Sequence, residues 1–459
     1  YCINDVELTY DLFWKIFTIY WYPDRELDLI NNTLNMFIHP KFELDLEALE
    51  EEQERINIHR NDLLVKAGVP KEVLTSVKKF KTLLAKHGIT PPDSLKKDNH
   101  EFTDLLYHEK EVVRNLVEAR LCFASSIEPS RIEKLIESAN RNNGLHVPLK
   151  YYGAHTGRWS GADKINLQNI TRNAKGLKKC FKAPPGHVVI NSDLSQIETR
   201  LLCYFAGQED MVENFRAGKD VYKEMASKIY RKDIDEITKE QRQVGKTAVL
   251  GCGYGMGKDR FHTALMKDGV FIPKGEARSI LSVYRNSVPH IKNLWSECKN
   301  YLANRVWYNK VTPIGRKGMV EPIEEGIRLP NGMVIFYMDL TSKPSEEFGH
   351  QFFYCNNGTF NKKIWHGTLA ENIVQALARI IIGDQINAIA KRYKVALTIH
   401  DSIVCIVPEA EQDEAVEFMR KVMTTAPEWA EDLPLNCEIE VGKNYGELEE
   451  VKEIENAII

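Results

Sequence analysis

The stretch HVVINSDLSQIETR, residues 187–200, contains the pattern that decides the fold. Its apolar start predicts a short buried β-strand, which carries Asp193 at its end. A helix is expected to begin with Ser195, because apolar residues then recur at helical spacing until Gly207. Asp193 is therefore predicted to lie at a strand-to-helix corner.

A second carboxylate is expected at the tip of a hairpin near the C-terminus. Residues 395–399 and 403–407 are typical of two strands, and HDS at residues 400–402 connects them. Two carboxylates at the ends of separate strands suit a two-metal phosphoryl-transfer site, because both must converge on divalent cations about 4 Å apart. Taken singly, Asp193 and Asp401 are better explained as helix-cap or turn residues. The pair needs independent support.

That support comes from QRQVGKTAVLGCGYGMG, residues 241–257. Arg242, Lys246, Leu250 and Tyr254 recur at every fourth position, so we expect them along one face of a helix. Cations on such a face can bind the phosphates of a nucleoside triphosphate, and the apolar and aromatic side chains can contact its sugar and base. The single glycines that end this pattern predict a hinge. A surface stripe that ends in a buried tyrosine is the alternative.

The N-terminal third is expected to be helical and locally basic. Residues 46–67 form an amphipathic pattern between Asp45 and Gly68, and a second, basic helix is predicted over residues 71–87. Between residues 59 and 97, nine Lys and Arg side chains stand against three acids, which gives a local charge of +6. Such a surface suits a polyanion, although on charge alone a solvated helix face is the commoner explanation.

Composition and cysteine spacing limit the class of protein. With 43% apolar and 27% charged residues the chain is typical of a soluble globular protein, and no uninterrupted apolar run approaches the roughly 18–20 residues of a membrane span. The nine scattered cysteines contain no CxxC pair, which favours a reducing, cytoplasmic compartment over a disulfide framework or a zinc site. Asn142-Asn143-Gly144 ends the helical patterns, so a domain boundary is expected near residue 145.

Four motifs occur in the order found in the family A DNA polymerases. They are AHTGRWSGADKINLQNI (154–170), DLSQIETR (193–200), RxxxKxxxLxxxYG (242–255) and IHDSIV (399–404). The chain resembles this family, the bacterial DNA polymerase I group, over nearly its whole length, and most resembles its bacteriophage members. YCIND, residues 1–5, is similar to the last motif of the proofreading exonuclease that precedes the polymerase in this family. We therefore expect an N-terminally truncated member.

The resemblance implies an α+β right-hand polymerase fold, with an antiparallel palm sheet and a mostly helical thumb and fingers. The implied divisions are a C-terminal remnant of the 3′-5′ exonuclease domain at residues 1–30, the thumb at 31–150, the first part of the palm at 151–208, the fingers at 209–345 and the second part of the palm at 346–459.

According to this resemblance, the chain is a DNA-directed DNA polymerase that adds deoxynucleotides to a primer 3′-hydroxyl in phage DNA replication. Two Mg²⁺ ions, which Mn²⁺ can replace, would be held by Asp193, the backbone carbonyl of Leu194 and Asp401. Lys246 would bind the triphosphate and donate a proton to the leaving pyrophosphate. Asp193, Asp401 and Lys246 are thus the implied catalytic residues.

The resemblance also implies residues that bind nucleotide and DNA. Glu198 would exclude a ribose 2′-hydroxyl, which favours DNA over RNA as the product. The implied nucleotide-binding residues are Arg242, Lys246, Leu250, Tyr254, Glu198 and Lys178. The implied DNA-binding residues, at the primer terminus and in the minor groove, are Arg158, Asn169, Gln375 and His400. The basic helices before Gly88 would contact duplex phosphates.

The chain departs from the family pattern near the implied site. Ser402 stands where many members have an acidic residue, and Leu250 stands where most have Phe or Tyr. Asn191-Ser192 also differs from the bacterial pattern. We expect the loss of an auxiliary carboxylate at Ser402 and of a flat contact with the nucleotide at Leu250.

Two other functions remain open at this point. A single-subunit RNA polymerase shares the palm and its two aspartates, but Glu198 is not expected in it. A catalytically silent module that binds duplex DNA would keep the fold and the basic thumb, with Ser402 as a sign of decay. The expected partners are primer-template DNA and deoxynucleoside triphosphates, with replication accessory proteins left open and no membrane. We expect a monomer in the cytoplasm of a bacterial host.

Overall fold

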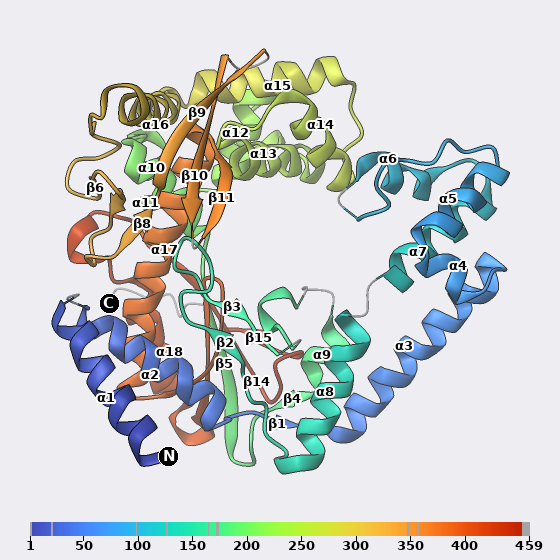
Figure 1. The fold of residues 1–459 in the computed structure, drawn as a ribbon, viewed down its shortest axis with the longest axis horizontal. Coiled ribbons are helices and arrows are strands. Elements are labelled where there is room, and N and C mark those ends of the chain that lie inside the picture. Colours follow the sequence, from blue (N-terminus) through green and yellow to red (C-terminus); the bar gives the residue numbers. More distant parts are fainter. Residues whose placement is uncertain are drawn as a thin grey trace.

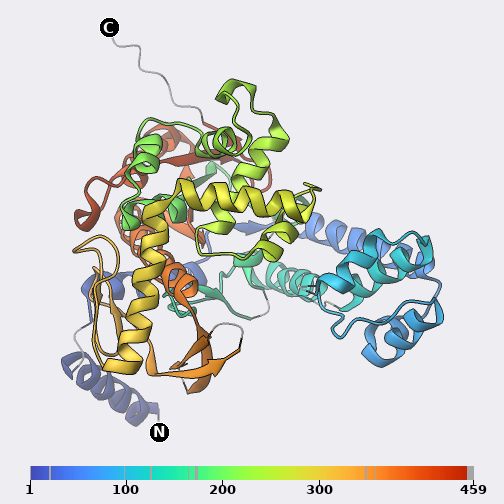
Figure 2. The same cartoon turned by 90° about the horizontal axis from the view of Figure 1, so that it is seen from above.

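The computed structural model of the chain describes residues 2–19, 22–97, 99–124, 127–163, 165–170, 174–346, 349–356 and 358–451. A central sheet connects two helical groups, which extend from it in different directions (Figure 1). Seen from above, the first helical group projects to one side of the molecule (Figure 2). The predicted α+β class, with an antiparallel sheet and mostly helical arms, is confirmed.

The central sheet has five antiparallel strands in the order β12-β13-β5-β14-β15. The predicted strand and the predicted hairpin are both confirmed, and the strand continues through Asp193. Residues 188–192 are all buried, because β5 lies in the middle of the sheet and helices cover it. The strands are β5 (His187–Leu194), β12 (Lys394–Ile399), β13 (Ser402–Pro408), β14 (Cys437–Gly442) and β15 (Glu449–Glu450).

Helix α17 (His366–Ala390) is the central helix of the core. It packs against the sheet and against α2, α10 (Ile197–Ala206) and α16 (Pro289–Tyr308). Among the described residues, α17 is the one helix long and apolar enough to cross a membrane, and 72% of its apolar window is buried in the protein. Its apolar character therefore follows from its position in the core. Helix α18 (Gln412–Thr424) packs beside it on the sheet.

One helical group is built on α3 (Leu46–Ala67), which begins and ends as predicted. Asp45 caps the helix by accepting a hydrogen bond from the amide of Ala48 at 3.3 Å. Gly68 ends it in a left-handed conformation with a φ of 62°. This group has its own apolar core, which includes Leu63.

The single basic helix predicted over residues 71–87 is wrong, because the structure has two helices there. Ser76 separates them with an extended backbone, and its hydroxyl accepts a hydrogen bond from the amide of Lys79 at 3.4 Å. Serine stabilises the start of a helix better than its interior, which explains the break. The other helices of this group are α4 (Lys71–Thr75), α5 (Val77–Lys86), α6 (His100–Thr103), α7 (Glu111–Ala124) and α8 (Ile127–Asn142).

The second helical group follows α10 in the sequence. Two three-stranded sheets, which the sequence patterns did not predict, come after its last helix. The larger one lies beside α16 (Figure 1), where the rings of Trp307 and Phe352 are 5.9 Å apart. The helices are α11 (Glu209–Arg216), α12 (Val221–Tyr230), α13 (Lys239–Cys252), α14 (Lys258–Lys267) and α15 (Lys274–Ser287). The strands are β6 (Glu321–Pro322), β7 (Gly326–Arg328), β8 (Val334–Phe336), β9 (Met338–Ser345), β10 (Gly349–Asn356) and β11 (Thr359–Ile364).

The two N-terminal helices differ in burial. α1 (Cys2–Ile19) exposes most of its apolar side chains, whereas α2 (Asp24–Ile38) packs against α17 with Leu29 and Met36 buried. The expected division at residue 30 falls inside α2. Tyr1 of the expected exonuclease motif lies outside the described residues. The remaining short elements are β1 (Glu43–Leu44), β2 (Leu149–Lys150), β3 (Ser160–Gly161), α9 (Lys175–Lys179) and β4 (Phe181–Lys182).

Candidate active site

The two predicted aspartates both lie at one end of the central sheet. Asp193 is near the end of β5, and Asp401 lies in the turn between β12 and β13. The amide of Leu194 donates a hydrogen bond of 3.0 Å to the carbonyl of Asp401, and Ser402 pairs with Asp193 across the sheet. The structure therefore brings these two backbone positions together although they are far apart in the sequence, and their joint role as metal ligands stays a prediction.

Arg158 connects two carboxylates of the site. Its Nη2 lies 2.6 Å from Oε1 of Glu198 and 3.3 Å from Oδ1 of Asp401. Glu198 comes from the first turn of α10, directly after the corner that follows Asp193. Burial raises the pKa of Asp401, against the opposing effect of Arg158, and the negative charge of Glu198 raises it further. The site is thus a cluster of negative charge that one arginine only partly compensates.

The residues present fit the expected magnesium site. Asp193 and Asp401 offer carboxylate oxygens, which Mg²⁺ prefers. The third expected ligand is the backbone carbonyl of Leu194, the residue that follows Asp193 on β5. Within the part of the chain that the structure describes, no group of three or more His, Cys, Asp or Glu side chains could hold a metal. Two carboxylates with a backbone oxygen and water would suffice, because Mg²⁺ usually keeps several of its waters.

Gln168 supports the tip that carries Asp401, and the sequence patterns did not single it out. Its side chain accepts a hydrogen bond from the amide of His400 at 3.0 Å and donates one to the carbonyl of Thr398 at 2.6 Å. The side chain is buried, and it comes from a short helical turn at Leu167–Asn169. Gln168 therefore fixes the loop at both sides, so that His400 can adopt a φ of 53°.

Two departures from the family pattern contact each other. The hydroxyl of Ser402 donates a hydrogen bond of 2.5 Å to Oδ1 of Asn191, and Nδ2 of Asn191 donates one of 3.0 Å to Glu440. Ser402 is buried, so its side chain is held inside the sheet next to Asn191. Ser402 and Asn191 thus form a buried hydrogen-bonded pair, and this contact explains why the two departures from the family pattern occur together.

The predicted helical stripe is correct for three of its four residues. Arg242, Lys246 and Leu250 lie on α13, whose first turn is capped by Thr238 in a capping box. Tyr254 lies beyond the end of this helix, so its placement on the helix is wrong. The helix ends because glycines follow, and Gly255 has a φ of 80°.

The side chains of this stripe have different surroundings. Nε of Arg242 lies 2.6 Å from Oδ2 of Asp220, so the arginine is paired within its own helical group. Lys246 is half-buried, and no hydrogen bond or ion pair of its side chain is recorded within the described ranges. Leu250 is 44% exposed. Burial raises the pKa of Tyr254, and the negative charges of Glu198 and Glu371 raise it further.

The other predicted residues lie around the same end of the sheet or on neighbouring helices. Nζ of Lys178 lies 5.0 Å from the ring centre of Tyr445. Burial and the charge of Asp193 both raise the pKa of Tyr445, so Lys178 and Asp193 share this neighbour. Gln375 of α17 donates a hydrogen bond of 3.2 Å to Glu371. Asn169 and His400 are exposed.

Known proteins resemble the chain in both sequence and fold. The family model described as DNA polymerase family A matches residues 44–447. DNA polymerase I of Borreliella burgdorferi is 25% identical over 394 residues, which are 84% of this chain and 39% of that protein. The DNA polymerase of Bacillus phage SP02 is 26% identical over 93% of this chain and 74% of that protein. The chain thus spans well under half the length of the bacterial relative.

A solved structure has the same fold. It is the polymerase domain of Pol1 from M. smegmatis, in a complex with DNA primer-template and dNTP. The TM-score is 0.70 at 19% sequence identity, and the match covers 92% of this chain and 70% of the other.

Proposed function

The chain belongs to DNA polymerase family A, and from this we propose that it is a DNA-directed DNA polymerase that extends a primer 3′-hydroxyl with deoxynucleotides. The observation that carries the proposal is the convergence of Asp193 and Asp401, joined through the 3.0 Å hydrogen bond between Leu194 and the Asp401 carbonyl. The names of the bacterial and phage relatives support this activity. The solved complex with primer-template and dNTP supports DNA and deoxynucleotides as the substrates.

In the proposed reaction, two divalent cations would activate the primer hydroxyl and stabilise the leaving pyrophosphate. Asp193, Asp401 and the carbonyl of Leu194 would hold these cations. Lys246 would contact the triphosphate and donate a proton to the pyrophosphate, and Arg242 and Lys178 would contact the outer phosphates. Arg242 would have to exchange its ion pair with Asp220 for the phosphate, because its Nε lies 2.6 Å from Oδ2 of Asp220.

The remaining assignments follow the same proposal. Arg158, Asn169, Gln375 and His400 would contact the primer terminus and minor groove, and Tyr254 would cover the new base pair. The helical group of residues 31–150 would be the thumb, residues 209–345 the fingers, and the two segments around the central sheet the palm. Most lysines at the tip of the first group are exposed, as phosphate contacts require. We also propose a monomer that acts in phage replication in the host cytoplasm.

Primer extension on a defined template tests the proposed function. The parent chain, Mg²⁺ and labelled primer-template are mixed with deoxynucleotides or ribonucleotides, and the added base is compared across four templates. We expect extension with the complementary deoxynucleotide only. Extension with ribonucleotides alone would instead indicate an RNA polymerase. Salt-sensitive duplex binding without extension would indicate a DNA-binding module.

Glu198→Ala is expected to relax sugar selection. The carboxylate lies in the first turn of α10 and is held by Arg158 at 2.6 Å, so it can occupy the space beside the sugar of an incoming nucleotide. Its removal should raise the ratio of ribonucleotide to deoxynucleotide insertion by about 10- to 200-fold, the usual range for excluding one small group. The ratio is measured by single-nucleotide insertion. Glu198→Gln, which keeps the size, is the control, and an unchanged ratio in the alanine variant would contradict the assignment.

A further inference from the structure

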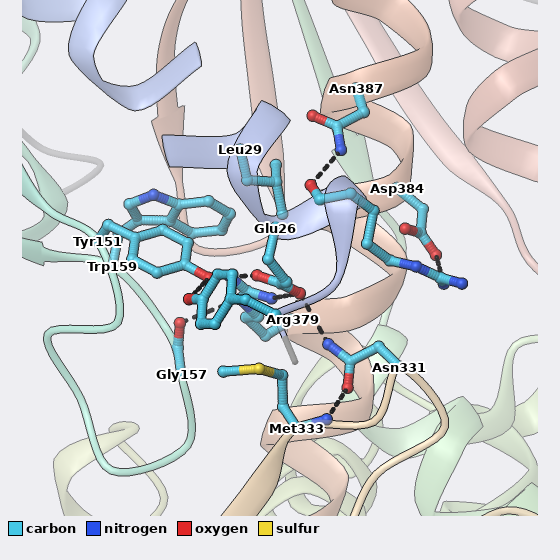
Figure 3. A network of polar contacts seen from close by, with 12 residues as sticks. Glu26, Leu29, Tyr151, Gly157, Trp159, Asn331, Met333, Arg379, Asp384 and Asn387 are labelled. Carbon is cyan, nitrogen blue, oxygen red and sulfur yellow. Dashed lines mark hydrogen bonds and ion pairs between the residues drawn. The ribbon is translucent and has the colours of Figure 1, made fainter. Parts of the chain in front are cut away.

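A buried ion pair connects α2 to α17 (Figure 3). Nη1 of Arg379 lies 2.6 Å from Oε1 of Glu26, and their side chains are only 2% and 1% exposed. Asn331 donates a second hydrogen bond to Oε1 at 2.7 Å, and the hydroxyl of Tyr151 donates one to Oε2. Four segments that are distant in the sequence therefore meet at one carboxylate.

The two charges of this pair are retained in the interior. Burial alone would raise the pKa of Glu26, but the hydrogen bond and charge of Arg379, together with the hydrogen bonds from Tyr151 and Asn331, lower this pKa. Such a pair is costly in a core, because both charges must be removed from water, and apolar residues of similar volume often give equal or greater stability. Stability alone therefore does not account for this ion pair, and the segments that Arg379 contacts suggest a second role.

Arg379 holds the turn that precedes Arg158. Nε of Arg379 donates a hydrogen bond of 3.1 Å to the carbonyl of Gly157, the residue next to Arg158. Its guanidinium also lies about 5 Å from the ring centres of three aromatic residues of the same segment, which are Tyr151, Tyr152 and Trp159. The arginine thus contacts this segment on both sides of Arg158.

The turn itself has little freedom. The amide of Gly157 donates to the carbonyl of Ala154, and the amide of Ala154 donates to the carbonyl of Arg158, both at 3.0 Å. Gly157 has a φ of 80°, and a Cβ there would lie 2.7 Å from the ring of Tyr152. On the far side, the indole of Trp159 donates to the hydroxyl of Thr33 in α2 at 2.8 Å. Helix α2 therefore helps fix the segment at two points.

We propose that Glu26 and Arg379 are positioning residues, which hold the turn at Gly157 so that Arg158 stays on Glu198 and Asp401. The inference rests on the proposed function, because it assigns these residues a part in that reaction. Glu26 lies outside the family match, which spans residues 44–447. Helix α2 thereby contributes to the active site although it touches none of the reacting groups.

The first test uses the double variant Glu26→Met/Arg379→Met, which replaces both charges with apolar side chains of similar length. The core remains filled, so the fold should be retained. The maximal rate of single-turnover primer extension should fall by about 10²-fold, as expected when a contact group is misplaced by about 1 Å. The affinity for primer-template should fall much less than the rate, because the basic residues between 59 and 97, which would contact the duplex phosphates, are unchanged. Glu26→Gln, which keeps the shape and the acceptor oxygen, should recover part of the rate.

Asn387→Ala is the matched control for the same helix pair. Asn387 accepts a hydrogen bond from Asn32 at 2.9 Å and donates one to the carbonyl of Arg25 at 2.8 Å, so its loss also weakens the contact between α2 and α17. It makes no hydrogen bond to the turn at Gly157 within the described residues. This variant should lose stability but keep the extension rate. A similar loss of rate in Asn387→Ala would show that the rate falls because the contact between α2 and α17 is weakened, and it would overturn the proposal.

Amide hydrogen exchange provides a readout that does not depend on activity. In the double variant, the amides of Ala154 and Gly157 should exchange faster than in the parent chain, whereas those of the central sheet should not. A folded double variant with parent rate and parent protection would overturn the proposal. If the parent chain itself fails to extend a primer, the proposed function fails, and unchanged exchange would then separately reject the positioning role. If the double variant does not fold, Glu26→Gln and Tyr151→Phe are measured in the same two assays.

Discussion

Asp193→Ala should abolish template-directed primer extension, with a loss of about 10³-fold or more, the upper end of what a single charge contributes to a transition state. Asp193 lies at the end of β5, next to the turn that contains Asp401, and its carboxylate is one of the two that could hold divalent cations there. In the proposed reaction, its loss would remove a ligand of the cations that would stabilise the attacking hydroxyl and the leaving group. Duplex binding should persist, because helices α4 and α5, which belong to the basic stretch of residues 59–97, lie away from the sheet (Figure 1). Extension is measured by gel and binding by fluorescence anisotropy.

The sheet supplies a control for this variant. Glu438 of β14 pairs with Asp193 across the other side of β5, and it is exposed. Glu438→Ala therefore removes a neighbouring carboxylate that is not next to Asp401, and it should leave extension within about threefold of the parent, the error normally attached to a single contact energy. Equal losses in Asp193→Ala and Glu438→Ala would show that general negative charge matters, and the assignment of a specific pair would be lost. Asp401→Ala should behave as Asp193→Ala does.

The sequence predicted the bounds of those helices that have capping residues at their ends. Asp45 and Gly68 limit α3 as expected, since a side-chain cap and a left-handed glycine act within a few residues. The signal failed at Ser76, where a single hydroxyl in an otherwise helical pattern starts a new helix. The sheet of β9–β11 was not predicted at all. Its strands mix polar and aromatic residues without clear alternation, because one face lies on α16 and much of the rest is exposed.

The site was predictable to the extent that its residues lie in short motifs. The corner at Asp193 and the tip at Asp401 each have a local pattern, and their convergence follows from the pairing of β5 with β13. The supports of the site have no such pattern. Gln168 reaches His400 across 232 residues of sequence, and Glu26 reaches Arg379 across 353. Contacts of this range depend on the packing of whole elements, which periodicity in one segment does not report.

Lys246 and Arg242 differ in their side-chain partners, and this difference could not be predicted from their spacing in the sequence. Both occur on the same helical stripe, yet Arg242 has a partner in Asp220 and lies 5.3 Å from the ring centre of Tyr222. No ion pair of Lys246 is recorded within the described residues, and its side chain is half-buried. A half-buried ammonium group without a carboxylate partner attracts phosphate strongly, because little competing charge has to be displaced. Arg242 would first have to break its ion pair.

Lys246→Ala should therefore lower the maximal rate of nucleotide insertion by about 10²- to 10³-fold, the range for one charge that acts on a transition state. It should weaken primer-template binding much less.

Arg242→Ala should lower the insertion rate less than Lys246→Ala does, because the energy that Arg242 gains from phosphate is offset by the ion pair with Asp220 that it gives up. Lys246→Arg, which keeps a cation, should recover binding of the nucleotide more than the rate, since a guanidinium does not readily give up a proton. Lys239→Ala, at the exposed start of the same helix, is the control and should leave both quantities unchanged. Rapid-quench insertion kinetics over a range of nucleotide concentrations separate the rate from the apparent Kd. Equal losses of insertion rate and of primer-template affinity in Lys246→Ala would place the lysine on the DNA, because a residue that acts on the leaving phosphates has no reason to affect the duplex.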